Sequence, residues 1–275
     1  MDRTVKVAAP EPPFRIPAAA FAVLRTVERS IPVLVLLATW EAVTRAGMVQ
    51  LFLLPPLSRV LVRFYADTIN GTIPYHMVET SITALSGFFL AAVAGVAIGA
   101  AMAVSRPIRY MIEPLVSLAF PIPKISFLPI FILWFGLDLM PKMLMVAFNC
   151  VVPITSATYL GARSIDKYIL WSAHSLGTPP RKLFWKIVMP AAAPQVISGL
   201  QIALPQALII GIVTEMLTGS DGLGSYMIRA VRFSDSETAF AGILAMLVTG
   251  LAYMQIAALI RRRVLRWHAE TAAEV

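Results

Sequence analysis

The stretch that decides the fold is ITALSGFFLAAVAGVAIGAAMAV, residues 82–104, which carries no charged side chain. A helix needs about 20 apolar residues to cross a bilayer, and lipid offers no partner to an unpaired backbone group. The stretch therefore predicts a membrane-spanning helix. Small residues recur in it at four-residue spacing, which allows another helix to approach closely. These residues are Ala91, Gly95, Gly99 and Ala103.

Further long apolar runs lie along the rest of the chain. Of its 275 residues, 58% are hydrophobic and only 14% are charged, and long soluble domains are absent. A soluble core does not need runs of this length. We therefore expect an all-α polytopic membrane protein with six transmembrane helices. The other five runs are residues 31–46, 114–137, 141–161, 190–218 and 239–260.

The chain is expected to form one transmembrane domain with a tail at each end. Residues 1–30 hold five basic side chains among several prolines, without a short apolar core followed by a small-residue cleavage site. They are interpreted as an uncleaved tail and not as a signal peptide. The transmembrane domain is expected at residues 31–262, with a connecting loop at 162–189, and residues 263–275 form the second tail.

The basic residues predict the orientation. If the first tail is cytoplasmic, that side holds five Lys and Arg in the tail, two in the second loop, five in the 162–189 loop and four at the C-terminal end, against five on the other side. Such an excess marks the cytoplasmic side. Both termini and the 162–189 loop are therefore expected inside. Topology and anionic lipid headgroups account for the net charge of +8, so no nucleic-acid partner is expected.

The third run in chain order, residues 114–137, is unlike an inert membrane anchor. It contains Pro121, Pro123 and Pro129, and each proline removes a backbone donor and crowds the preceding turn. The run is therefore expected to be kinked or broken. Lys124 lies at the same place, either extending to the cytoplasmic interface or facing a wet cavity.

Polar side chains gather in the fourth and fifth runs. Polar groups are costly in lipid, so these side chains should face the interior of the helix bundle. Each one alone is an ordinary interhelical hydrogen bond, but together with the broken third run they indicate a solute path. They are Asn149, Thr155, Ser156, Thr158, Gln195, Gln201, Gln206, Thr214 and Glu215.

No residue pattern indicates an enzyme. His76, His174 and His268 lie far apart without metal-ligand spacing, and neither a nucleophile elbow nor a GxxxxGK[ST] loop occurs. The lone Cys150 is interpreted as a small buried hydrophobe. We therefore expect no catalytic, metal or cofactor site in this chain. If ATP drives transport, another chain must bind it.

The 162–189 loop is expected to hold two short helices. Residues 164–177 predict the first, with Ser164 as its cap, Asp166 in its first turn and Gly177 at its end. The second is expected to begin at Thr178 as cap, with Pro179 and Pro180 in the first turn, where a missing donor costs nothing.

Basic residues follow at once in the second short helix. Arg181 and Lys182 oppose the helix dipole at that end, so local stability does not account for them. Either the cytoplasmic location of the loop or contact with a partner surface accounts for these two basic residues.

This loop resembles the signature of the inner-membrane permease subunits of bacterial ATP-binding-cassette (ABC) importers. That signature reads EAA, three residues, Gly, nine residues, Ile, one residue, Leu-Pro. In WSAHSLGTPPRKLFWKIVMP, residues 171–190, the matches are Ala173, Gly177, Ile187 and Pro190, with Met189 for Leu, while Trp171 and Ser172 depart from the pattern.

The resemblance covers most of the chain. FLLPPLSRV (52–60), PIPKISFLPIFILWFGLD (121–138) and EMLTGSDGLGSYM (215–227) are similar to the branch that serves nitrate, sulfonate, taurine and related solutes. The resemblance implies a type I ABC importer permease fold with cytoplasmic coupling helices, in a bacterial inner membrane. It also implies a dimer of permeases on two ATPase subunits that bind ATP and Mg²⁺. A periplasmic or lipid-anchored solute-binding protein would supply the solute.

The resemblance assigns roles to two groups of residues. The coupling surface for the ATPase would consist of His174, Ser175, Leu176, Gly177, Thr178, Pro179, Arg181 and Lys182. Leu176 would be an apolar anchor, and Gly177 is expected either at positive φ or where a partner backbone approaches too closely for a side chain. Asn149, Gln201 and Gln206 would contribute to a central cavity between two permease copies, and Lys124 would border its cytoplasmic end.

Two other classes stay open at this point. A self-sufficient secondary transporter or channel is disfavoured by the matched loop, the six runs and the lack of a visible inverted repeat. An integral-membrane enzyme is disfavoured by the lack of a catalytic grouping. The substrate stays open as well, since similar permeases also carry pyrimidine-type vitamin precursors.

Overall fold

The computed structural model describes the backbone of residues 18–265 and the side chains of residues 31–265, and all regular structure in this part of the chain is helical. Backbone contacts divide the chain into two units, residues 1–59 and 60–275. Each unit is described by itself. The predicted boundaries of the tails and the transmembrane domain stay predictions.

The first unit contains the helix α1, Ala18–Arg45, which begins inside the predicted tail and includes the first predicted span. The loop after it folds back onto the end of this helix. The Glu41 carboxylate accepts hydrogen bonds from the Ser58 backbone N–H (3.1 Å) and hydroxyl (2.8 Å), and pairs with Arg45 at 2.6 Å. These bonds fix the FLLPP segment, because its proline-rich backbone offers few donors of its own.

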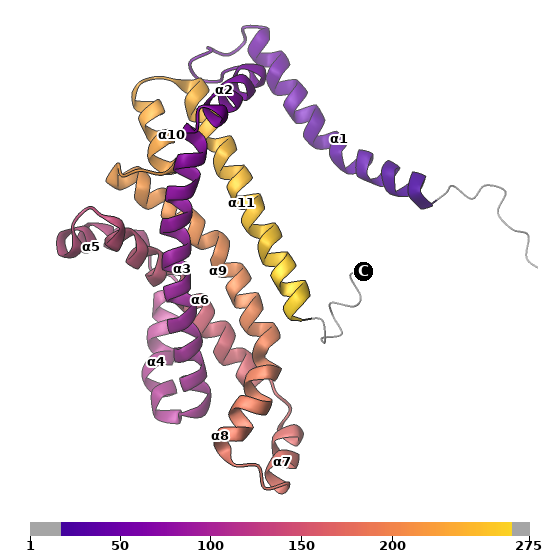
Figure 1. Ribbon diagram of the computed structural model, residues 1–275, viewed down its shortest axis with the longest axis vertical. Coiled ribbons are helices and arrows are strands. Elements are labelled where there is room, and N and C mark those ends of the chain that lie inside the picture. Colours follow the sequence, from indigo (N-terminus) through magenta and orange to yellow (C-terminus); the bar gives the residue numbers. More distant parts are fainter. Residues whose placement is uncertain (1–17, 266–275) are drawn as a thin grey trace, which may run out of the picture. The chain divides into compact units, whose positions relative to one another are not determined.

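Three long helices form the centre of the second unit, and they lie side by side in Figure 1. The predicted close approach is confirmed where α3 meets α6. A Cβ at Gly95 would lie 2.9 Å from Ile154 Cβ, and one at Gly99 would lie 2.6 Å from the Thr155 carbonyl oxygen. The backbones can approach this closely only without side chains there. The three helices are α3, Thr72–Val104; α6, Leu139–Arg163; and α9, Met189–Thr218.

Buried small residues fill the core between these helices, among them Ala84, Ala91, Cys150, Ala203 and Ala207. The expectation for Cys150 is confirmed, since its side chain is fully buried. Of the polar residues of the fourth and fifth runs that were predicted to face inward, four are buried, whereas Gln195 is exposed. Thr155, Thr158, Thr214 and Glu215 are all buried.

Shorter helices and the last long helix complete the second unit. The Tyr226 hydroxyl donates to the Asp67 carboxylate (2.5 Å), which also pairs with Arg63 (2.8 Å), so α10 is tied to α2. These helices are α2, Leu57–Ile69; α10, Leu223–Arg232; and α11, Ser236–Val264.

The third predicted run is broken, as its prolines predicted. The run at 114–137 does not form one helix. It forms the end of α4, Arg106–Ala119, then a short 3₁₀ helix, Lys124–Phe127, and α5, Leu128–Phe135, with a bend of 99° between the two halves. In Figure 1, α4 runs beside α3 while α5 points away from it.

In the described part of the chain, four helical segments are long and apolar enough to cross a membrane: α3, α6, Pro180–Thr218 and α11. The bent pair makes a fifth if it counts as one span. These five correspond to the second to sixth predicted runs. The first run, on α1, is helical but is not among these segments, so its place as a sixth span stays a prediction.

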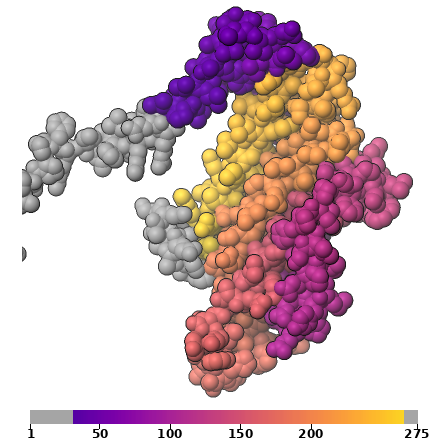
Figure 2. Space-filling model, turned by 180° about the vertical axis from the view of Figure 1, so that it is seen from behind, coloured from indigo at the N-terminus to yellow at the C-terminus, as the bar shows by residue number. Residues whose placement is uncertain are grey.

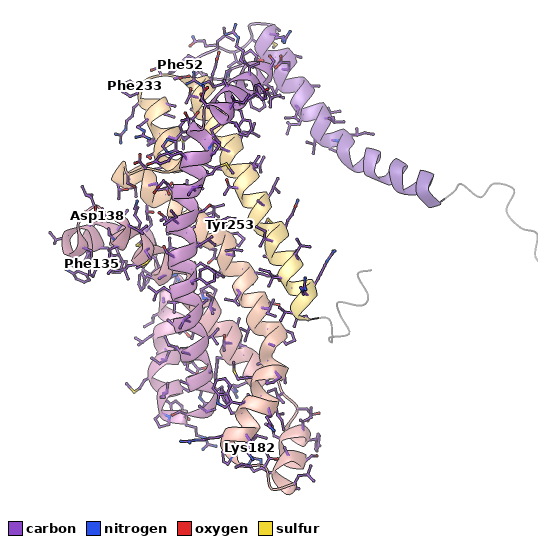
Figure 3. All side chains as sticks on the ribbon, viewed as in Figure 1. Phe52, Phe135, Asp138, Lys182, Phe233 and Tyr253 are labelled. Atoms are coloured by element: carbon purple, nitrogen blue, oxygen red, sulfur yellow. The ribbon has the colours of Figure 1, made fainter. Side chains whose placement is uncertain are left out.

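The connecting segments of the second unit lie at its two ends. Figure 1 places α10 at one end and α7 and α8 at the other, where Figure 2 shows the loop as a protrusion. In Figure 3, Lys182 marks the loop end and Phe233 the opposite end. The fold therefore separates the predicted coupling loop from the loop between α9 and α11 by the length of the helices.

Candidate functional site

A pocket of about 380 Å³ lies at the break of the third span, facing α6 and α9. Three of the four predicted path residues line it, namely Lys124, Asn149 and Gln206. They come from three separate elements, and all three are half-buried. The remaining walls are mostly apolar, and they are Phe120, Ile122, Pro123, Ile125, Val152, Pro153 and Ile210.

Aromatic packing positions Lys124 at this pocket. The ring of Phe148 on α6 meets Phe127 and Phe131 edge-on, with centroid distances of 5.6 and 6.1 Å. These contacts hold the second half of the broken span against α6. Since Lys124 begins the 3₁₀ helix directly after Pro123, the same packing fixes its backbone beside Asn149.

Gln201 does not line the pocket. Its side-chain amide donates to the Ala257 carbonyl oxygen of α11 at 3.4 Å. Five residues turn a helix by about 140°, so Gln201 faces α11 when Gln206 faces α6. The expected grouping of all four residues is therefore wrong for Gln201.

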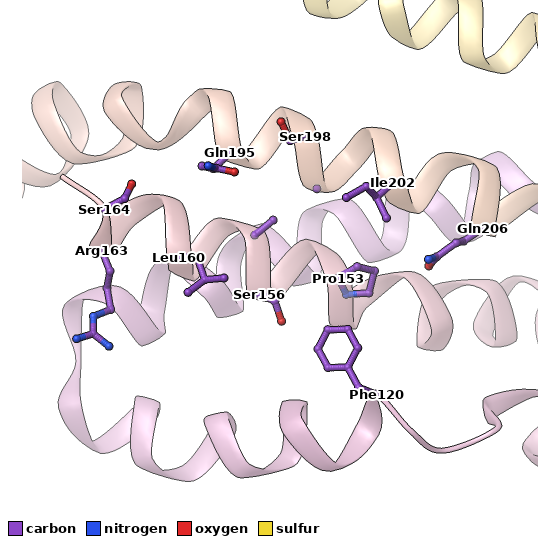
Figure 4. A pocket seen from close by; sticks show the side chains of 12 residues that line it. Phe120, Pro153, Ser156, Leu160, Arg163, Ser164, Gln195, Ser198, Ile202 and Gln206 are labelled. Atoms are coloured by element: carbon purple, nitrogen blue, oxygen red, sulfur yellow. The ribbon is translucent and has the colours of Figure 1, made fainter.

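A second, larger pocket of about 720 Å³ continues from the first. The two share Phe120, Pro153 and Gln206 as lining residues. Figure 4 shows Gln206 and Phe120 at one end of this pocket and Arg163 with Ser164 at the other. The lined space therefore follows α6 and α9 from the break to the end of α6.

The helices α6 and α9 pack closely behind this second pocket. A Cβ at Gly161 would lie 2.6 Å from Gln195 Cβ, and a Cβ at Gly199 would collide with Ala157 Cβ. Interiors packed this tightly transmit displacement instead of absorbing it. The two helices are therefore expected to move as a pair.

The loop at the end of α6 begins with α7, Lys167–Ser175. The cap of α7 is Asp166, whose carboxylate accepts from the Tyr168 N–H at 2.9 Å. The prediction of Ser164 as cap is wrong, because Ser164 ends α6 and its hydroxyl donates to the Gly161 carbonyl oxygen. The aspartate is also the better partner for the positive end of the helix dipole.

The C-terminal end of α7 has two crossed hydrogen bonds. The Gly177 N–H donates to the His174 carbonyl oxygen (2.9 Å) and the Thr178 N–H to that of Ala173 (3.1 Å). This is a Schellman motif, which needs a residue in the left-handed region. Gly177 supplies it with φ of +72°, so the predicted positive φ is confirmed.

The second arm of the loop differs from the prediction. Pro179, and not Thr178, caps the helix α8, Pro180–Leu183. This helix does not end, because one π-helical turn, Phe184–Val188, joins it to α9. Helical hydrogen bonding thus continues from Pro180 to Thr218.

Most predicted coupling residues face away from the protein. Leu176 is 85% exposed, an unusual fraction for a leucine, and Ala173 behind it is buried. Thr178 is half-buried. The exposed members are His174, Ser175, Leu176, Gly177, Pro179, Arg181 and Lys182.

Sequence reasoning did not find a buried polar cluster at the other end of the second unit. Three backbone N–H groups at the start of α10 bond to side chains of other helices. Gly222 donates to His76 Nδ1 (3.2 Å), Leu223 to Thr80 Oγ1 (2.8 Å) and Gly224 to Glu215 Oε2 (3.0 Å).

Two further contacts extend this cluster. Thr80 Oγ1 also donates to Glu215 Oε2 at 2.9 Å. Lys142, one of the five Lys and Arg residues that the charge count assigns to the non-cytoplasmic side, is 7% exposed and donates to Ser220 Oγ at 3.0 Å. The signal in the sequence was the 215–227 motif itself, where a glutamate precedes a glycine-rich helix start.

Within residues 31–265, whose side chains the structure describes, no group of three or more His, Cys, Asp or Glu side chains is placed to hold a metal ion.

Comparison with known proteins gives the family. A family model described as "binding-protein-dependent transport system inner membrane component" matches residues 87–266. The putative aliphatic sulfonates transport permease protein SsuC of Bacillus subtilis (strain 168) is 28% identical over 233 residues, covering 85% of this chain and 84% of SsuC. The taurine transport system permease protein TauC of Escherichia coli (strain K12) is 26% identical over 241 residues, covering 86% and 88%.

A solved structure agrees with the fold. A chain of the MetNI methionine ABC transporter, in an inward-facing conformation, aligns with a TM-score of 0.64 at 15% identity and covers 72% of this chain and 98% of its own length. Helical order, broken third span and family match thus agree with the type I importer fold. The chain belongs to the binding-protein-dependent transport system inner membrane components and is a transmembrane permease subunit of an ABC importer.

Proposed function

We propose that this permease moves a small organic anion of the sulfonate class into the cell by alternating access. The proposed substrate class rests on the smaller pocket. Lys124, Asn149 and Gln206 line it together, and none of its lining residues is acidic. A cation flanked by amide donors suits a sulfonate, whose oxygens accept charge-assisted hydrogen bonds. The names of SsuC and TauC support the same class.

A neutral aromatic solute, such as a pyrimidine-type precursor, fits this pocket less well. Lys124 has no carboxylate within 4 Å among the described residues. Even a half-buried cation without a counter-ion loses part of its hydration, and an anionic solute reduces that cost while a neutral one does not. The pocket therefore favours the anion.

The proposed coupling surface is the exposed side of α7 and the turn after it. His174, Ser175, Leu176, Gly177, Thr178, Pro179, Arg181 and Lys182 would dock in a groove of a separate ATPase, which binds ATP and Mg²⁺. Both ends of α7 are closed by side-chain or Schellman hydrogen bonds. A short helix held in this way can act as a rigid lever.

The proposed assembly has two permease copies on two ATPase subunits, fed from outside by a periplasmic or lipid-anchored solute-binding protein. Both termini and the loop would be cytoplasmic, and membrane lipid would cover the apolar flanks. The basic residues near the loop support this orientation. Gln201 is left out of the solute path, because its amide contacts α11.

The experiment is uptake of labelled taurine by proteoliposomes that contain the permease with its ATPase and binding protein. Lys124→Gln should lower the uptake rate about tenfold, since a charge-assisted contact is lost, and Lys124→Arg should retain more of it. Arg262→Gln, an exposed change at the end of α11, is the control. Wild-type uptake by Lys124→Gln would contradict the assignment of the pocket.

A further inference from the structure

We propose that the larger pocket is a second anion-binding site, in which Arg163 holds the solute on the cytoplasmic side before release. This inference rests on the proposed import of an organic anion. The anion would stop at a second place, at Arg163, a residue to which neither the family match nor the motifs give a role.

The two pockets make a continuous route. Phe120, Pro153 and Gln206 line both, and from there the larger pocket follows α6 to its last residue, Arg163, as Figure 4 shows. A solute that moves along this route from Lys124 toward the loop end would pass Phe120 before it reaches Arg163.

The charges along this route have one sign. Among the lining residues of both pockets the charged ones are Lys124 and Arg163, one near each end, and none is acidic. A route lined in this way attracts anions at both ends. Loss of the anion from Lys124 is then compensated by the contact with Arg163.

Arg163 keeps donors available for a ligand. One guanidinium nitrogen donates to the Tyr159 hydroxyl at 2.9 Å, which orients the planar group. A guanidinium has five N–H donors in a fork that matches the oxygens of an oxyanion. Among the described residues no carboxylate lies within 4 Å of Arg163, whereas its neighbour Arg109 has Glu113 at 3.9 Å.

Neutral donors line the space between the two cations. Ser156 and Gln195 make no hydrogen bond within residues 31–265, so their donors can turn to a ligand. By contrast, Ser164 and Ser198 donate to carbonyl oxygens of their own helices, at 2.9 and 3.0 Å. The second site therefore offers one cation with an amide and a hydroxyl, much as the first offers one cation with two amides.

The position of the site connects it to the coupling loop. Its walls are the last turns of α6 and the first turns of α9, which are the two arms that carry α7 and α8. Asp166, the cap of α7, follows Arg163 by three residues. Since close packing at Gly161 and Gly199 holds the arms together, motion of the loop moves the whole pocket wall relative to Phe120.

The test is inhibition of transport by anion on the cytoplasmic side. Proteoliposomes with permease, ATPase and binding protein are loaded with ethanesulfonate on the side of the ATPase, and initial uptake of labelled taurine is measured from the other side. For the wild type we expect saturable inhibition. Arg163→Gln should raise the inhibitory concentration about tenfold or more, and Arg163→Lys should restore part of the inhibition.

Three controls separate this site from general surface charge and from the first pocket. Arg106→Gln removes an exposed cation at the start of α4 that lines neither pocket, so inhibition should stay as in the wild type. Glycerol loaded in place of ethanesulfonate should not inhibit. Lys124→Gln should lower uptake itself.

The outcomes distinguish the two proposals. Uptake that depends on Lys124, without inhibition by internal ethanesulfonate, would overturn the second site and leave the proposed function standing. Equal effects of Arg163→Gln and Arg106→Gln would also overturn it, in favour of unspecific attraction to a basic surface. A wild type without any sulfonate uptake would overturn the proposed function, and the second site with it.

Discussion

Gly222 is the residue on which the buried polar cluster at α10 depends most directly. Its φ is +138°, its N–H bonds to His76, and a Cβ there would collide with the Glu215 carboxylate. Gly219, three residues earlier, also has a positive φ, of +69°, but has no atom within 4 Å of a Cβ. Gly219 thus shows the effect of a left-handed backbone alone, while Gly222 combines a steric collision with a backbone conformation that is essentially restricted to glycine.

Gly222→Ala is expected to lower the stability of the folded permease by about 2–4 kcal/mol, because strain and displacement of a buried hydrogen-bonded carboxylate add. Gly219→Ala should cost only about 1 kcal/mol, from strain alone. The midpoint of thermal unfolding in detergent measures both. Equal midpoints for the two variants would show that Glu215 moves freely, contrary to its two hydrogen bonds, from Thr80 and from the Gly224 N–H.

At the scale of elements, the spans and the proline break could be predicted from the sequence because both depend on local chemistry. The length of the apolar runs predicts α3, α6, α9 and α11 as spans, and the backbone donors that the prolines lack predict the break before Lys124. The bend of 99° could not be predicted, since it depends on how Phe127 and Phe131 pack against α6. The cap at Asp166 was missed because both Ser164 and Asp166 are good caps, and the end of α6 decides between them.

The candidate site was predictable to a similar degree. Lys124, Asn149 and Gln206 were found by their cost in lipid, which only says that a polar residue faces inward. The cost of a polar residue in lipid cannot distinguish a residue of the solute path from one that bonds to a neighbouring helix. Gln201 is of the second kind, because its amide bonds to the Ala257 carbonyl oxygen. His76 and Thr80 were missed, because their partners are backbone groups far away in the sequence.

The packing of α3 on α6 gives a prediction at the same scale. Gly99→Leu should destabilise the folded permease by about 1–3 kcal/mol or more, since the new side chain has no room beside the Thr155 carbonyl oxygen. Ala97→Leu, on the exposed side of the same helix, should change stability little. Thermal unfolding of the two purified variants compares them, and equal loss would contradict the close α3–α6 contact.

At the scale of the whole molecule, the orientation can be tested with single cysteines. Ser175 in the coupling loop and Asn70 between α2 and α3 are both exposed, and the native Cys150 is buried and gives little background labelling. A membrane-impermeant thiol reagent applied to intact cells should label Asn70→Cys and not Ser175→Cys. After permeabilisation both should react. Labelling of Ser175→Cys in intact cells would contradict the predicted topology.

The central claim is that the loop after α6 couples ATP hydrolysis in a partner subunit to movement of the membrane-spanning helices. The measurement is ATP hydrolysis stimulated by the loaded binding protein in the reconstituted transporter, for the wild type, Gly177→Asn and Gly177→Asp. No atom lies within 4 Å of a Cβ at position 177, so both variants should fold and insert with a backbone cost of about 1–2 kcal/mol or less. Asparagine tolerates the left-handed region and should retain most of the stimulation, while the aspartate adds a charge at the proposed contact and should abolish stimulation and uptake. Wild-type stimulation and uptake by Gly177→Asp would contradict the account.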